Sequence, residues 1–271
     1  MTTTRIDFDA VKNRQRNIWA SGDYAAVAAR IVPMAERLVE AADLTAGSVV
    51  LDVATGSGNA ALAAARAGAE VIGVDYVGSL LNRGRVRAAA EGFPVEFKEG
   101  DAEDLPFEDA SFDAVLSVVG VMFTPDQEKA AAELLRVCRS GGTIALANWT
   151  PSSFVGDMFR TVAAYAPPPA GVKPPGLWGT EERLRELFGD GIAHLQTRQR
   201  TFLFRFRFPE EFAEFFRINY GPVGKAFEAL DEPDQKRLWD DLVELARKHN
   251  RTSGNAVAIP AHYLEAIAVR R

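Results

Sequence analysis

The stretch that decides the fold is Val49-Val50-Leu51-Asp52-Val53-Ala54-Thr55-Gly56-Ser57-Gly58-Asn59-Ala60. Its apolar start predicts a buried strand, and Gly56 and Gly58 let the backbone turn sharply and approach a ligand closely. The alanine-rich segment from Ala60 to Ala67 then predicts a helix that ends at Gly68. Strand, glycine loop and helix in this order predict a nucleotide-type pocket at the carboxyl end of the strand.

The charges near this loop bear on which ligand it binds. The spacing from Gly56 to Ala61 also satisfies the G-x-G-x-x-A pattern of dinucleotide-binding folds, so spacing alone does not name the ligand. A pyrophosphate needs cations or free amide donors, whereas Asp52 precedes the loop and the loop carries no Lys or Arg. Asp75 and Asp101 follow the next two predicted strands. Three acids around one cleft favour a cationic ligand.

Each of these carboxylates suits one part of such a ligand. Asp75 comes 23 residues after Asp52, close to the separation of roughly 20 residues at which an acid holds both ribose hydroxyls. An ionised carboxylate accepts two hydrogen bonds from such a diol. Asp101 is placed to accept from the exocyclic amine of an adenine, with the backbone around Ala102 contacting the ring. A ligand with adenine, ribose, an ammonium and a sulfonium fits all three acids.

Four segments resemble, in the right order, the motifs of class I S-adenosylmethionine-dependent methyltransferases, and in particular the quinone-biosynthesis C-methyltransferase or methyltransferase type 11 group. They are Leu51 to Asn59, Gly100 to Phe107, Ser111 to Ser117 and Leu134 to Gly142. The first departs from the family in having Ala54 where glycine is usual. The resemblance implies S-adenosyl-L-methionine as cofactor and an α/β, Rossmann-like, doubly wound fold. Its seven-stranded sheet is expected to be mostly parallel with an antiparallel last strand, and helical lid elements are expected to cover it.

The resemblance also assigns site residues. Cofactor contacts are expected from Asp52, Ala54, Gly56, Gly58, Asp75, Tyr76, Asp101, Ala102 and Ser117, and from Trp19 and Tyr24 of an amino-terminal helical segment. For Trp19 and Tyr24, packing of the helices onto the sheet is an equally good interpretation. Acceptor contacts are expected, from position in the chain and not from the resemblance, at Met122, Phe123 and Trp149, which follow or end the fourth and fifth predicted strands, and at Trp178.

The rest of the chain alternates between β-like and helix-like segments, which favours a parallel sheet covered by helices. Strands are predicted at Val49 to Ala54, Glu70 to Tyr76, Val95 to Glu99, Asp113 to Val119, Thr143 to Trp149, Thr201 to Phe208 and Tyr263 to Val269. A helix opening near Asp126 is expected to run to Cys138 and to be stopped by Gly141-Gly142. Three parts follow: an amino-terminal helical lid (1–43), a cofactor-binding core (44–150), and an acceptor-binding insertion and lid that includes the last two strands (151–271).

The sequence offers no evident general base or metal site. His194, His249 and His262 are the only histidines, and each stands without a supporting acid, so a structural role is the better interpretation. His262 is the weak candidate for catalysis. No cluster has metal-ligand spacing, so no metal is expected. Four phenylalanines, Phe202 to Phe208 at alternate positions, share one strand face, and core packing is favoured there over a substrate-facing wall.

Composition fits an ordinary enzyme. The chain has 271 residues, of which 47% are hydrophobic and 25% are charged, enough for one large domain or a core with a lid. A net charge of −6 argues against a nucleic-acid partner, because such proteins need a basic surface. A single cysteine and the lack of an export or membrane segment predict a cytoplasmic protein without a membrane partner.

We therefore predict methyl transfer to a small, largely apolar molecule by in-line displacement, driven mainly by positioning and exclusion of water. Two alternatives stay open: an NAD-type oxidoreductase, and a non-methylating protein that retains the S-adenosylmethionine pocket. The sequence leaves undecided whether the acceptor atom is oxygen, nitrogen or carbon, and whether the protein is a homo-oligomer.

Overall fold

The computed structural model describes residues 6–271, and its centre is one seven-stranded sheet in the order β3-β2-β1-β4-β5-β7-β6. The strands are β1 (Val49–Val53), β2 (Glu70–Asp75), β3 (Glu96–Glu99), β4 (Phe112–Val118), β5 (Cys138–Trp149), β6 (Ile192–Phe206) and β7 (Val257–Arg270). Neighbours among β1 to β5 pair in parallel, whereas β7 is antiparallel to both β5 and β6. The predicted mostly parallel sheet with an antiparallel last strand is confirmed.

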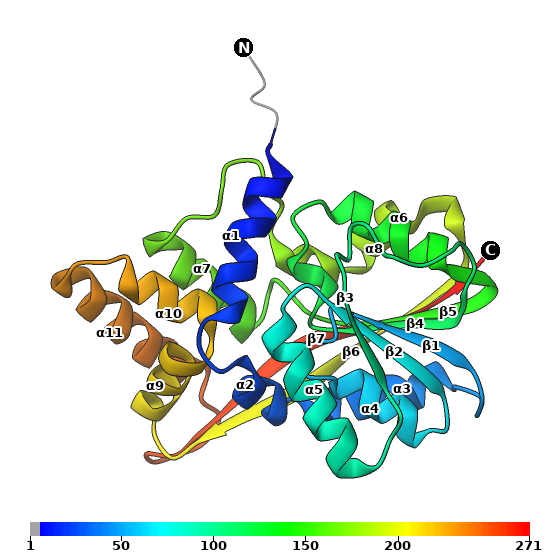
Figure 1. Ribbon diagram of the computed structural model, residues 1–271. Coiled ribbons are helices and arrows are strands. Elements are labelled where there is room, and N and C mark those ends of the chain that lie inside the picture. The colour runs from blue at the N-terminus through cyan, green and yellow to red at the C-terminus, as the bar shows by residue number, and fades with distance from the viewer. Residues whose placement is uncertain (1–5) are drawn as a thin grey trace.

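Helices cover both faces of the sheet. They are α1 (Phe8–Ala20), α2 (Tyr24–Arg30), α3 (Val32–Ala42), α4 (Asn59–Arg66), α5 (Gly78–Glu91), α6 (Gln127–Val137), α7 (Phe154–Tyr165), α8 (Glu181–Phe188), α9 (Pro209–Asn219), α10 (Gly221–Glu228) and α11 (Glu232–His249), with short 3-10 turns η1 (Val121–Phe123), η2 (Pro175–Gly179) and η3 (Gly189–Gly191). Figure 1 shows α3, α4 and α5 below the sheet and α6 and α8 above it. A separate group, α7 and α9 to α11, lies beside α1 on the left of the view. None of the helices within residues 6–271 is both long enough and apolar enough to span a bilayer.

The amino-terminal helices follow from local signals. Asp7 caps α1, its carboxylate accepting from the backbone N–H of Ala10 at 3.0 Å. Gly22, with φ +72°, makes the turn between α1 and α2. The structure adds a second break at Ile31, because Pro33 in the first turn of α3 cannot donate the hydrogen bond that would continue α2.

Some predicted boundaries are wrong. Helix α6 ends at Val137, within one residue of the predicted end at Cys138. Strand β5, however, begins at Cys138 instead of Thr143, so the glycine pair lies within a strand and does not stop the helix. Gly142 lies instead at an irregularity in the pairing of β4 with β5, where a Cβ would come within 2.8 Å of the Arg139 and Asp113 carbonyl oxygens. A glycine is required at this position because the neighbouring backbone carbonyl groups leave no room for a Cβ, and not because a helix ends there.

Strand β7 begins at Val257 instead of Tyr263, and strand β6 begins at Ile192 instead of Thr201. The first half of β6 lies at the edge of the sheet and carries exposed polar side chains, so the sequence there lacks an apolar signal. At the other end Phe208 is 40% exposed, because Pro209 has already begun α9. The predicted row of four phenylalanines is therefore a row of three.

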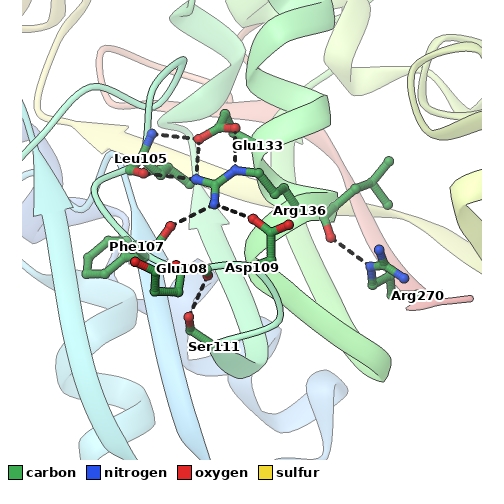
Figure 2. Close-up of polar contacts among 9 residues, drawn as sticks. Leu105, Phe107, Glu108, Asp109, Ser111, Glu133, Arg136 and Arg270 are labelled. Atoms are coloured by element: carbon green, nitrogen blue, oxygen red, sulfur yellow. Dashed lines mark hydrogen bonds and ion pairs between the residues drawn. The ribbon is translucent and has the colours of Figure 1, made fainter.

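A guanidinium on α6 fixes the loop that follows β3 (Figure 2). Arg136 donates to the carbonyl oxygens of Leu105 and Phe107 at 2.9 and 2.7 Å and pairs with Asp109 at 2.9 Å. Its remaining donors bind Glu133, whose carboxylate also accepts from the N–H of Leu105. These contacts hold the loop that begins at Asp101 against the body of the protein.

Candidate functional site

A cleft lies where β1, β2, β3 and β4 end, and α1 and α2 close it from above. It contains about 930 Å³ of empty space, part of which is open to solvent. Nine of the expected cofactor residues line it: Trp19, Tyr24, Asp52, Ala54, Gly56, Asp75, Tyr76, Asp101 and Ala102. The carboxyl end of a parallel sheet is where open α/β folds bind ligands, and the structure brings the predicted residues together there.

The turn after β1 uses three residues with left-handed backbone. Ala54, Gly56 and Gly58 have φ of +53°, +56° and +84°. Gly56 lines the cleft, whereas Gly58 does not. A Cβ at Gly58 would lie 2.9 Å from Cζ of Phe97, so packing against β3 requires this glycine. Gly58 was predicted to contact the cofactor, but it does not line the cleft; it allows the loop to pack closely against Phe97 of β3.

Asp52 is buried at the end of β1 with one oxygen free. Its Oδ2 accepts from the Thr55 hydroxyl at 2.5 Å and from the N–H of Ala61 at 2.9 Å. Its Oδ1 has no hydrogen-bond partner within residues 6–271, although it is buried. Burial raises the pKa of Asp52 to about 7, against the lowering effect of its two donors. An unpartnered buried carboxylate oxygen beside an open cleft is a site for a cationic or hydrogen-donating group.

Asp75 ends β2 and holds the glycine loop in place. Its Oδ2 accepts from the N–H of Gly56 and its Oδ1 from the N–H of Val77, each at 2.9 Å. Burial raises the pKa of Asp75 to about 6, and these backbone donors oppose the rise. Each carboxylate oxygen retains a lone pair, so the group can still accept from a ligand diol.

The acids after β3 are tied to α1 by a lysine that the sequence interpretation missed. Lys12 of α1 places Nζ 2.7 Å from Oδ2 of Asp101 and 3.2 Å from Oε2 of Glu103. Glu103 is almost fully buried and also accepts from the N–H of Asp126 at the start of α6. This chain of contacts joins α1, the loop after β3 and α6. Among the described residues that line the cleft, Lys12 is the only cation.

One face of α1 forms the outer wall of the cleft. Lys12, Gln15 and Trp19 all line it, and they stand three and four positions apart on the helix. Lys12 is at the end of the cleft marked by Asp101, and Trp19 is at the end marked by Tyr24, with ring centroids 5.5 Å apart. Their spacing in the sequence could have shown that Lys12 and Gln15 lie on the same helix face as Trp19.

A second, apolar chamber adjoins the cleft. It contains about 340 Å³ of empty space, part of which is open to solvent, and is lined by Tyr24, Val27, Ile31, Val119, Phe123, Trp149, Val155, Met158, Phe159, Phe204, Phe216 and Tyr220. Tyr24, Ile31, Val119 and Phe123 line both spaces and so form the partition between them. The expected acceptor residues Phe123 and Trp149 lie at this chamber. Phe204 of β6 is also part of its wall, although core packing is the favoured prediction for that strand.

Four other predicted site residues lie elsewhere. Met122 and Trp178 are fully buried and line neither space, because they pack in the core. Ser117 is fully buried too; its hydroxyl donates to the Val53 carbonyl at 2.7 Å and accepts from the N–H of Val121, which ties β4 to β1. His262 bonds Thr201 on the neighbouring strand, with 3.0 Å between Nδ1 and Oγ1, and lines neither space.

The described residues fit an adenosyl ligand that bears an ammonium. The free oxygen of Asp52 and the open lone pairs of Asp75 and Asp101 are hydrogen-bond acceptors that line the cleft. Within residues 6–271, no group of three or more His, Cys, Asp or Glu side chains is arranged to hold a metal ion.

Comparisons with known proteins agree with this geometry. A methyltransferase domain, Methyltransf_11, matches residues 51–146. The chain is 41% identical to the uncharacterized protein Rv1403c of Mycobacterium tuberculosis over 91% of this chain and 92% of the relative. It is 36% identical to the demethylmenaquinone methyltransferase of Deinococcus radiodurans over 51% of this chain and 58% of that enzyme.

A solved structure shares the fold. The putative methyltransferase from Bacillus halodurans superposes with a TM-score of 0.60 at 22% identity, covering 87% of this chain and 97% of that chain. Sheet order, acid-lined cleft, domain match and relatives all lead to one conclusion: the chain belongs to the class I S-adenosylmethionine-dependent methyltransferases.

Proposed function

We propose that this enzyme binds S-adenosyl-L-methionine in the acid-lined cleft and methylates a small, largely apolar molecule held in the adjoining chamber. The observation that supports this is the shared partition, since Tyr24, Ile31, Val119 and Phe123 face both spaces. A donor in one space and an acceptor in the other would meet there. The acceptor is a small molecule, and neither a nucleic acid nor a membrane is needed for this chemistry. Whether two copies associate is left to measurement.

The bound donor supplies an electrophilic methyl group on a positively charged sulfur. The chain's own carboxylates then divide the binding task. On this proposal, Asp101 accepts from the adenine amine, Asp75 from the ribose hydroxyls and Oδ1 of Asp52 from the ammonium; all three acids line the cleft, and Oδ1 of Asp52 has no partner among the described residues. Backbone hydrogen bonds already fix Asp52 and Asp75, so little reorganisation is required when a ligand enters.

The chamber itself favours a neutral, apolar acceptor. Among its described lining residues none is an acid, a histidine, a lysine or an arginine, and the side chains that carry a polar atom are Tyr24, Tyr220 and Trp149. Burial raises the pKa of both phenols, so they stay protonated at neutral pH and cannot act as bases. The chain would therefore act by aligning the acceptor atom with the methyl carbon and by excluding water.

Two measurements test this proposal. Calorimetry should show binding of S-adenosylhomocysteine and no binding of NADH. Labelled S-adenosylmethionine, offered with a panel of phenols, amines, carboxylic acids and quinone precursors, should transfer its methyl group to an apolar member. Binding of NADH in preference to S-adenosylhomocysteine would overturn the cofactor assignment. Tight cofactor binding with methylation of charged acceptors only would overturn the acceptor class.

A further inference from the structure

Val119 has a backbone conformation that its side chain disfavours. Its φ is +54°, in the left-handed region. Across residues 6–271 the other non-glycine residues with positive φ are Asp43, Ala54 and Ala110, so Val119 alone among these four is β-branched. In this region a β-branched side chain crowds the backbone more than any of the other three does.

Neighbouring strands impose this conformation. The N–H of Val119 donates to the Ala147 carbonyl of β5 at 2.8 Å. The next residue, Gly120, fits so closely against the turn after β1 that a Cβ would lie 2.6 Å from the Ala54 carbonyl oxygen. Two residues earlier, Ser117 bonds Val53 and Val121. Because contacts on both sides fix the chain, the strain at Val119 persists in the folded state.

The strained residue carries its side chain at the partition. Val119 is 6% exposed and is one of the four residues that line both the cleft and the chamber. A glycine would relieve the backbone but would leave the space between cleft and chamber without this side chain. The chain thus keeps a valine where its backbone favours glycine, which argues for a task performed by the isopropyl group.

We propose that Val119 determines acceptor specificity, its isopropyl group closing the partition and limiting how far an acceptor extends towards the methyl donor. This inference rests on the proposed function, because it takes the chamber to be the acceptor site. On this proposal, acceptors with a single small ring are favoured over those with larger fused rings as long as the isopropyl group of Val119 is present.

The variants Val119→Gly and Val119→Ala test the backbone part of this proposal. At an ordinary buried position the glycine variant is less stable than the alanine variant, since glycine loses more backbone entropy on folding. At Val119 the order should be reversed, with Val119→Gly unfolding at the higher urea concentration. Val121 is the matched control, because it is fully buried two residues away and lines neither space. There the alanine variant should be the more stable one. The normal order at both positions would show that Val119 carries no strain.

Two uncharged probes test the specificity part. Calorimetry with phenol and with 2-naphthol, each with and without S-adenosylhomocysteine, compares one ring with two. In Val119→Gly the ratio of 2-naphthol to phenol affinity should rise by about tenfold, the factor that corresponds to 1.4 kcal/mol. In Val121→Ala it should stay within about twofold. An unchanged ratio in Val119→Gly, no binding of either probe to that variant, or an equal rise in Val121→Ala would overturn the proposal. Failure of the wild type to bind S-adenosylhomocysteine would instead refute the proposed function. The probe affinities measured without S-adenosylhomocysteine would still test whether Val119 limits the size of a molecule in the chamber.

Discussion

Asp75 has two tasks, and the second was visible only in the structure. The sequence placed it for the ribose hydroxyls, but its Oδ2 also accepts from the N–H of Gly56 and so supports the glycine loop. Asp101 is similar, because its Oδ1 accepts from the N–H of Glu103 while its Oδ2 bonds Lys12. These carboxylates are thus oriented before a ligand arrives, which lowers the entropic cost of binding.

Replacement of Asp75 by alanine should weaken the binding of S-adenosylhomocysteine by roughly 1.5 to 3 kcal/mol, the range for hydrogen bonds to a charged group. Titration calorimetry measures this loss directly. Asp104→Ala is the control, since Asp104 is an exposed acid in the loop after β3 and does not line the cleft. Equal affinities for wild type and Asp75→Ala would mean that the ribose is held by another group.

The binding of S-adenosylhomocysteine should strengthen as the pH rises. Burial raises the pKa of Asp75 to about 6 and that of Asp52 to about 7, whereas only the ionised forms accept fully from hydroxyls and an ammonium. The ligand therefore favours ionisation, and binding should release protons between about pH 5.5 and 7.5. Calorimetry in buffers of different ionisation enthalpy counts those protons. An affinity independent of pH over this range would contradict the prediction.

The same two pKa values set a pH trend for the ligand-free protein. Both lie above the value of about 3.9 for an unfolded aspartate, so the folded state binds these protons more tightly than the unfolded state does. The contribution of the two groups to the free energy of unfolding therefore falls as the pH rises from about 4 to about 7.

At the scale of helices and loops, the loop after β3 is held in place by the side chain of Arg136 on α6, which we call the clamp. Arg136 pairs with Glu133 and Asp109 and donates to two backbone carbonyls of the loop, as Figure 2 shows. The pairing with Glu133 and Asp109 raises the pKa of Arg136 further above its usual value, so the clamp stays charged at every working pH.

Removal of this clamp in Arg136→Met should lower the free energy of unfolding by roughly 2 kcal/mol, because Glu133 and two carbonyls lose a charged partner. The affinity for S-adenosylhomocysteine should fall as well, since the loop that starts at Asp101 loosens. Urea unfolding and calorimetry measure the two effects. Arg139→Met is the control, because Arg139 is half-exposed and its pair with Asp113 should contribute about 1 kcal/mol at most. A loss in Arg136→Met no larger than in Arg139→Met would refute the clamp.

Across the molecule, the amino-terminal and carboxy-terminal helices meet over the two spaces. A Cβ at Gly221, the first residue of α10, would lie 2.0 Å from the Ile18 carbonyl oxygen of α1. A Cβ at Gly22 would lie 3.0 Å from the Asn219 carbonyl oxygen of α9. Trp19 and Tyr220 pack edge to face near the same place, with ring centroids 5.5 Å apart. The two groups of helices are therefore closely packed against each other, and Figure 1 shows α1 beside α10.

A side chain added between α1 and α10 should therefore change both the stability of the protein and the rate at which S-adenosylhomocysteine is released. Gly221→Ala should lower the free energy of unfolding by roughly 1 to 3 kcal/mol through overpacking and should speed the release of S-adenosylhomocysteine. Stopped-flow displacement follows the release. Gly78→Ala is the matched change, because the nearest atom to its Cβ would be 3.6 Å away. If Gly221→Ala has the same free energy of unfolding and the same release rate as the wild type, the close packing of α1 against α10 does not matter for either.

The sequence by itself determined the core of this protein. An apolar strand, a glycine turn and carboxylates after successive strands are local patterns, so strands β1 to β4 and the places of Asp52, Asp75 and Asp101 could be predicted from them. The family resemblance supplied the antiparallel last strand. Burial periodicity does not reveal which apolar side chain faces a cavity, which is why Met122 and Trp178 were expected at the acceptor and lie in the core.

Only the tertiary structure decided which residues of the amino-terminal and carboxy-terminal helices line the two spaces. Lys12 reaches Asp101 across 89 positions of sequence, and Tyr24 and Phe216 line one chamber from opposite ends of the chain. The strain at Val119 likewise arises from contacts with β5 and with the turn after β1. Such contacts depend on how distant segments pack, and no local pattern of residues encodes them, because each helix is equally amphipathic whichever partner it meets.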